Sequence, residues 1–124
     1  MKVLYICTEL YPFLKTGGLA DVSAALPPAL QAGDCDVRLL LPAFPAIEKA
    51  STAMRAVAPL PTIKSPWGPA PALPQADIAV ATLPGIAIPV YLLRAPSLYD
   101  RAGTPYLGPD GKDWSDNAIR FAAL

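Results

Sequence analysis

Residues 1–41 read MKVLYICTELYPFLKTGGLADVSAALPPALQAGDCDVRLLL, and they give the clearest indication of the fold class. Residues 1–6 form an apolar run rich in β-forming side chains, which is typical of a central strand in a parallel sheet. Apolar residues then recur at helical spacing from Leu19 to Gln31, and residues 37–41 have the character of a second buried strand. Strand, glycine loop, helix and strand in this order predict the βαβ unit of a parallel sheet.

Prolines and a glycine modify the predicted helix. Pro27 and Pro28 fall inside the helical pattern, where each removes a backbone hydrogen-bond donor. We therefore expect them to kink the helix or to divide it into two short helices. Gly33 follows the pattern and predicts the end of the helix.

The second half of the chain is rich in proline. Residues 59–74 carry six of the 16 prolines, so helix is nearly excluded there and any strand would be short or at a sheet edge. Strands are expected at 78–83 and 86–93, and Pro84-Gly85 between them predicts a tight antiparallel hairpin. Residues 95–114 are expected to form a loop.

A last helix is expected at the end of the sequence. Ser115 is the predicted N-cap, and Asp116 falls in the first turn. Apolar residues follow as far as Leu124, where the sequence stops inside the helix with no capping residue. Natural domains rarely end in this way, so we expect the native chain to continue.

The composition narrows the class of protein. With 124 residues, 53% of them hydrophobic, the chain is one small domain or a piece of a larger one. Ten basic and ten acidic side chains give zero net charge, which argues against a partner such as nucleic acid or an anionic membrane. No apolar run approaches the roughly 20 residues of a membrane span, and the first residues do not resemble a signal peptide.

The side-chain inventory excludes several kinds of active site. The sequence has no histidine, so neither a Ser-His-Asp triad nor a histidine-ligated zinc site can be built from it. Cys7 and Cys35 are too few and too far apart for a zinc motif. Without an export signal, we expect two buried thiols in preference to a disulfide. No metal site is expected.

The residues best placed for binding are 15–22, Lys-Thr-Gly-Gly-Leu-Ala-Asp-Val, between the first strand and the first helix. In open parallel sheets ligands bind at the carboxyl ends of the strands, where this loop lies. Adjacent glycines let a ligand approach the backbone, and the helix start offers free N–H groups. Lys15 adds a charge that suits a diphosphate. A plain turn with a solvated lysine fits the spacing equally well, because no known phosphate-binding signature is matched.

Several separated stretches, in the same order, resemble one family. Residues 3–45, 95–101, 103–106 and 114–121 are similar to bacterial glycogen synthases and plant starch synthases. These are retaining glucosyltransferases with the two-domain fold called GT-B. The resemblance implies an α/β fold: a Rossmann-like parallel sheet with an inserted β-hairpin. It also implies that residues 1–124 are the N-terminal part of the first GT-B domain, with the remainder of that domain and the second domain absent.

The resemblance assigns roles to residues near the glycine loop. Lys15 matches the family lysine that contacts the phosphates of ADP-glucose, and Gly17 and Gly18 match the glycines that lie against the donor. Glu9 matches a carboxylate near the glucan-acceptor side of the cleft; a solvated loop acid is its alternative role. Asp21 either orients the loop or caps the helix start, and the structural role is favoured.

Further roles fall near the end of the chain. Tyr106 matches a tyrosine that lines the sugar cleft, with plain packing as its alternative role. Asp116 and Asn117 are candidates for hydrogen bonds to sugar hydroxyls, and helix capping is an equal alternative for Asp116. Residues 99–101 are expected to brace the long loop and not to touch substrate.

For the intact enzyme, the resemblance implies transfer of glucose from ADP-glucose to the non-reducing end of an α-1,4-glucan such as glycogen. No metal or other cofactor is implied. The family's N-terminal histidine and the donor-binding residues of its second domain are not in this sequence, so these residues alone are expected to be inactive. No catalytic residue is assigned within them.

Other interpretations stay open at this stage. The chain could be a free-standing, non-enzymatic glucan- or nucleotide-binding module, or a remnant with neither activity. A transferase that uses another sugar nucleotide is a third possibility, because few of the residues that select ADP over UDP are expected here. The start at Met1 without a transit peptide favours a bacterial, cytoplasmic protein. The sequence does not determine an oligomeric state.

Overall fold

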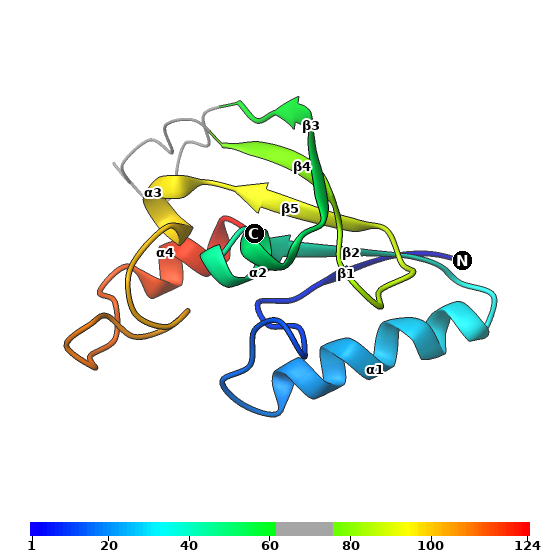
Figure 1. The fold of residues 1–124 in the computed structure, drawn as a ribbon, viewed down its shortest axis with the longest axis horizontal. Coiled ribbons are helices and arrows are strands. Elements are labelled where there is room, and N and C mark those ends of the chain that lie inside the picture. The colour runs from blue at the N-terminus through cyan, green and yellow to red at the C-terminus, as the bar shows by residue number, and fades with distance from the viewer. Residues whose placement is uncertain (62–75) are drawn as a thin grey trace.

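The structure is a computed structural model that describes residues 1–61 and 76–124. Most of the proline-rich stretch 59–74 therefore lies outside the described residues. The prediction that this stretch lacks helix stays a prediction. The described residues form an α/β fold in which helices pack beside one sheet (Figure 1).

The sheet has five strands in the order β1-β2-β5-β4-β3. Parallel pairing joins β1 (Lys2–Ile6) to β2 (Asp36–Pro42), and β2 to β5 (Val90–Arg94). Antiparallel pairing joins β5 to β4 (Asp77–Thr82), and β4 to β3 (Ala53–Pro59). Both the parallel unit and the antiparallel hairpin predicted from the sequence are confirmed. The hairpin connection is longer than the two-residue turn expected, because the strands end at Thr82 and resume at Val90.

One helix, α1 (Leu19–Ala32), links the two parallel strands β1 and β2. It runs without a break through Pro27 and Pro28, so the division into two helices, one of the two effects expected of these prolines, does not occur. The Pro27 side chain is fully buried, and tertiary packing of such a face supplies most of the stability of a short helix. The helix ends at Gly33, as predicted, with the Gly33 N–H donating to the Ala29 carbonyl.

Three further short helices occur within the described residues. The helix α2 (Pro45–Ala50) follows β2, and α3 (Pro96–Tyr99) interrupts the stretch 95–114 that was expected to be loop. The helix α4 (Asn117–Ala122) has Asp116 at its N-cap position, so the prediction of Ser115 as the cap is wrong by one residue. No side-chain hydrogen bond caps this helix, because the Asp116 carboxylate is bound elsewhere.

Neither α2 nor β3 was predicted. All seven residues of β3 are exposed. Its sequence, AMRAVAP, has Arg55 as its one charged residue and shows no alternation of apolar and polar side chains by which a strand is found in a sequence. Its pairing with β4 makes it a strand, and that partner is distant in the chain.

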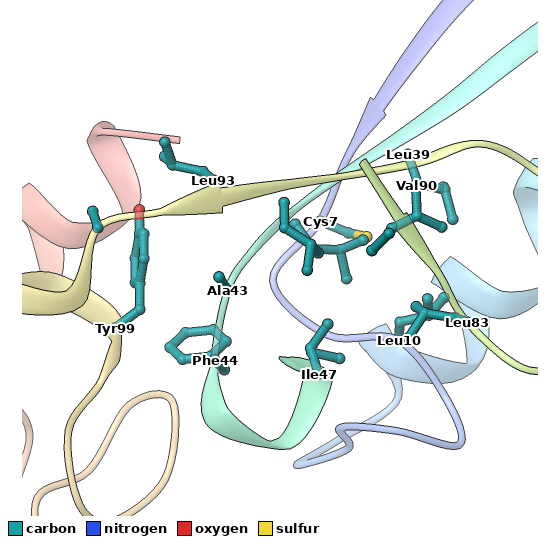
Figure 2. Close-up of a cluster of buried hydrophobic side chains, with 14 of the residues drawn as sticks. Cys7, Leu10, Leu39, Ala43, Phe44, Ile47, Leu83, Val90, Leu93 and Tyr99 are labelled. Carbon is teal, nitrogen blue, oxygen red and sulfur yellow. The ribbon is translucent and has the colours of Figure 1, made fainter. Parts of the chain in front are cut away.

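The core lies between the sheet and the elements that follow its parallel strands. Alternate residues of β2 and β5 are buried on one face, and Ile47 of α2 packs with them. Figure 2 shows Leu10 next to Leu83, below Leu39 and Val90. Both cysteines are free thiols: Cys7 is buried, as expected, whereas Cys35 is half-buried. No helix of the described residues is long and apolar enough to cross a membrane.

The strand β1 lies at an edge of the sheet, so the prediction of a central strand for residues 1–6 is wrong within the described residues. It carries exposed apolar side chains. Within the described residues it pairs with β2 alone. Leu4 and Ile6 are 55% and 51% exposed, on the opposite face from Val3 and Tyr5, which pack against the core. An open, apolar edge strand is a template for pairing with another chain.

We predict that the 124-residue chain associates with itself through β1. A charge on an edge strand opposes strand pairing, so Leu4→Lys should shift the chain toward monomer in sedimentation velocity. Val22→Lys is the matched control, because Val22 is similarly exposed, at 52%, but lies on α1. Equal effects of the two substitutions would mean that general solubility, not the β1 edge, governs association.

Candidate functional site

The candidate site lies where the parallel strands end. The loop 7–18 leaves the carboxyl end of β1, and the segment 95–107 leaves the carboxyl end of β5, which runs parallel to β1 on the other side of β2. In sheets of this kind the carboxyl ends of parallel strands form the binding edge. Side chains from both segments meet there, which brings together residues that are almost a hundred positions apart.

Glu9 is the centre of this contact. Its carboxylate is only 2% exposed and accepts hydrogen bonds from the Thr16 N–H at 2.7 Å, the Thr16 hydroxyl at 2.5 Å and the Gly17 N–H at 3.3 Å. The Tyr106 hydroxyl donates a fourth bond to Oε1 at 2.6 Å. Burial alone would raise the pKa of Glu9, but these hydrogen bonds outweigh it, so the pKa lies below its ordinary value. Glu9 is therefore not the solvated loop acid considered as its alternative.

Tyr106 is fixed on several sides. Its hydroxyl lies 3.1 Å from the Thr8 hydroxyl, and its ring lies 5.5 Å from the ring of Phe121. Burial and the bond to Glu9 raise its pKa. The phenol is thus a neutral donor that ties the segment after α3 to the segment after β1.

Lys15 and Asp21 form a pair at the surface. The Lys15 ammonium donates to both carboxylate oxygens of Asp21, at 2.9 and 2.8 Å, and lies 5.6 Å from the centre of the Tyr11 ring. The two side chains are 45% and 51% exposed, so the pair contributes little to stability. Asp21 does not cap α1; it orients Lys15 at the start of that helix.

Gly17 and Gly18 leave open space in front of the loop. A Cβ atom built on either residue would meet no atom within 4 Å, and neither backbone has a positive φ. The internal structure therefore does not require glycine at these positions. The Gly17 N–H is bound to Glu9, whereas Gly18 N and Leu19 N find no acceptor within residues 1–61 and 76–124.

Asp116 and Asn117 are engaged inside the chain. The Asp116 carboxylate binds the Arg101 guanidinium in a two-pronged ion pair at 2.9 and 2.7 Å, and this bond lowers the pKa of Asp116. The Asn117 amide donates to the Tyr106 carbonyl at 2.8 Å and accepts from Arg120. Both side chains brace the segment that carries Tyr106, as expected for Arg101 in the same loop.

Sequence reasoning missed Arg120. Its side chain is 1% exposed, and its guanidinium donates to the carbonyls of Leu98 and Pro105, at 2.8 and 3.1 Å. Burial lowers its pKa. Its carbonyl accepts a bond from the Tyr99 hydroxyl at 2.9 Å. The sequence signal that could have identified Arg120 is its place inside an apolar helical stripe. An arginine buried there requires hydrogen-bond acceptors close to its guanidinium.

A pocket of about 470 Å³ lies beside this network, between residues 44–46 and 99–105, with Arg120 in its wall. None of the eight sequence-predicted site residues lines it. The glycine loop instead faces solvent. No cluster of metal-ligating side chains occurs within the described residues.

The contacts of Glu9 predict an acid-dependent stability. Because its pKa is lowered on folding, Glu9 stabilises the fold above the unfolded pKa of about 4.3, and this contribution is lost as the pH falls through the folded pKa. Glu9→Gln should lower Tm at pH 7 by about 4–8 °C, the equivalent of about 1 kcal/mol, and should flatten the loss of Tm on acidification.

Glu48→Gln is the opposite control. Burial raises the pKa of Glu48, so its charged form disfavours folding as the pH rises through the folded pKa. Its replacement by glutamine should leave Tm at pH 7 unchanged or higher. An unchanged Tm for Glu9→Gln at pH 7 would contradict the assignment of Glu9 as a stabilising charge.

The chain is similar to proteins of one family along its whole length. A family model described as the starch synthase catalytic domain matches residues 2–124. A glycogen synthase of Albidiferax ferrireducens is 72% identical over all 124 residues, and one of Paramagnetospirillum magneticum is 49% identical. The chain spans 25% and 24% of the length of these two relatives.

A solved structure shows the same fold. The catalytic domain of starch synthase IV from Arabidopsis thaliana, bound to ADP and acarbose, matches 73% of this chain and 17% of its own, with a TM-score of 0.57 and 26% identity. The family model covers nearly every residue, and the relatives match the chain from end to end. The chain therefore belongs to the starch synthase catalytic domain family.

Proposed function

We propose that the chain is the N-terminal part of the first GT-B domain of a glycogen synthase. The intact enzyme transfers glucose from ADP-glucose to the non-reducing end of an α-1,4-glucan and retains the anomeric configuration. The observation that carries the proposal is the open loop of Gly17 and Gly18 at the carboxyl edge of the sheet, beside an exposed lysine. The named relatives are glycogen synthases, and the similar solved structure holds ADP.

The glycines support a ligand in front of the loop. Glycine costs conformational entropy on folding, and here no internal contact requires it. A ligand that approaches the backbone closely supplies the missing reason. Its site is open, which suits a donor that a second domain covers from the other side.

Lys15 and the start of α1 match a diphosphate. The free N–H groups of Gly18 and Leu19 lie at the positive end of the helix dipole, and the Lys15 ammonium is held nearby by Asp21. ADP gains negative charge as it leaves in the transition state, and such donors stabilise that charge. The N–H groups of Thr16 and Gly17 take no part, because Glu9 occupies them.

In this proposal Tyr106 contacts the glucan. Its hydroxyl is bound to Glu9, so its ring is the surface offered to a sugar. Asp116 and Asn117 hold the segment that carries Tyr106 and do not contact the sugar. Closure of two domains would exclude water and suppress hydrolysis of the donor. The proposal requires no metal or cofactor, and a cytoplasmic location remains a prediction from the sequence.

A chimera provides the test. The quarter of the Albidiferax glycogen synthase that this chain matches, at 72% identity, is replaced by this chain. We expect the chimera to elongate glucan with ADP-glucose. Lys15→Ala should lower kcat/KM for ADP-glucose about tenfold to a hundredfold, the effect of losing one hydrogen bond to a charged group. Lys49→Ala, at an exposed position on α2, is the matched control.

The same experiment separates the alternatives. A folded chimera with no transferase activity, beside an active parent relative, would reject the enzymatic role and favour a binding module. Activity with UDP-glucose in preference to ADP-glucose would identify a different donor. Equal activity of Lys15→Ala and Lys49→Ala would remove Lys15 from the donor site.

A further inference from the structure

We propose that Glu9 is a positioning residue that fixes the donor loop, residues 15–18, against the segment that carries Tyr106, and that Thr16 is its main contact in that loop. This inference rests on the proposed function. It differs from the role implied by resemblance, in which Glu9 is a carboxylate near the glucan-acceptor side of the cleft. It also gives Thr16 a role that the sequence did not indicate.

The carboxylate of Glu9 has no acceptor position left for a substrate. A carboxylate offers about four lone-pair sites, and Glu9 accepts four hydrogen bonds from Thr16, Gly17 and Tyr106. The side chain is 2% exposed, so a sugar hydroxyl cannot reach it without breaking one of them. Its contacts serve the chain itself.

Glu9 holds the backbone of the donor loop directly. Two of its bonds come from the consecutive N–H groups of Thr16 and Gly17, so it binds the loop much as an anion binds at a helix start. These residues lie between Lys15 and Gly18, the two positions proposed to meet the diphosphate. A shift of the Glu9 carboxylate therefore moves both of them.

The same carboxylate oxygen joins the two sides of the site. Oε1 accepts from the Thr16 hydroxyl and from the Tyr106 hydroxyl. Within residues 1–61 and 76–124 no cation pairs with Glu9, since Lys15 pairs with Asp21 and Arg101 with Asp116. The negative charge of Glu9 is thus stabilised by these neutral donors. The loss of one donor weakens the hydrogen bonds that the others make.

Kinetics of the chimera test the role of Thr16. Thr16→Val removes the hydroxyl but keeps the size of the side chain. We expect KM for ADP-glucose to rise about tenfold, while KM for glucan changes by less than about twofold. Thr16→Ser should restore the lower KM. Thr52→Val is the matched control, because the Thr52 hydroxyl bonds the Thr82 carbonyl at the far edge of the sheet.

The shared oxygen predicts coupling across the site. Tyr106→Phe should also raise KM for ADP-glucose, although Tyr106 lies on the glucan side. In a Glu9→Ala background, Thr16→Val should cause no further rise, because its partner is already gone. Tyr91→Phe is the matched control, since its hydroxyl accepts a bond from Arg38 on the sheet.

A second measurement does not depend on catalysis. Hydrogen exchange of the Thr16 and Gly17 amides in the chimera should be slow, and Glu9→Ala should accelerate it while β2 amides stay protected. If the chimera is active and Thr16→Val leaves its KM for ADP-glucose unchanged, this inference is overturned while the proposed function stands. Unchanged exchange in Glu9→Ala would overturn it even in an inactive chimera, whereas inactivity with accelerated exchange would reject only the proposed function.

Discussion

The parallel pairing of β1 with β2 and of β2 with β5 determines where the candidate functional side chains lie. Each of these strands runs in the same direction, so the chain leaves all of them at one edge of the sheet. The glycine loop follows β1, α2 follows β2 and α3 follows β5. Without this pairing, the segments around Glu9 and Tyr106 would have no common place to meet.

Two buried charges at this edge are stabilised in the same manner. Glu9 is surrounded by N–H and hydroxyl donors, and Arg120 by backbone carbonyls and the Asn117 amide oxygen. Neither pairs with an opposite charge among the described residues. A buried ion without such partners costs several kcal/mol, so these hydrogen bonds are a condition of the local fold. These hydrogen bonds also fix the conformation of the segments at this edge, because each donor and acceptor must lie at one position.

The surface pair of Lys15 and Asp21 has a different character. Its high exposure allows the lysine to exchange Asp21 for a more strongly charged ligand at small cost. A loop backbone held by Glu9, beside an exposed charged side chain, is the arrangement that the proposed donor site requires.

The amino-acid sequence by itself determined the βαβ unit, the β4–β5 hairpin and the open glycine loop, because apolar periodicity and glycine act over a few neighbouring residues. It also indicated Lys15 and Tyr106 through family resemblance. Only the tertiary structure decided β3, the course of α1 through Pro27 and Pro28, and the contacts of Glu9 and Arg120. The bond between Glu9 and Tyr106 joins residues 97 positions apart. No local pattern encodes such a contact, because it exists only once the parallel strands have brought their carboxyl ends together.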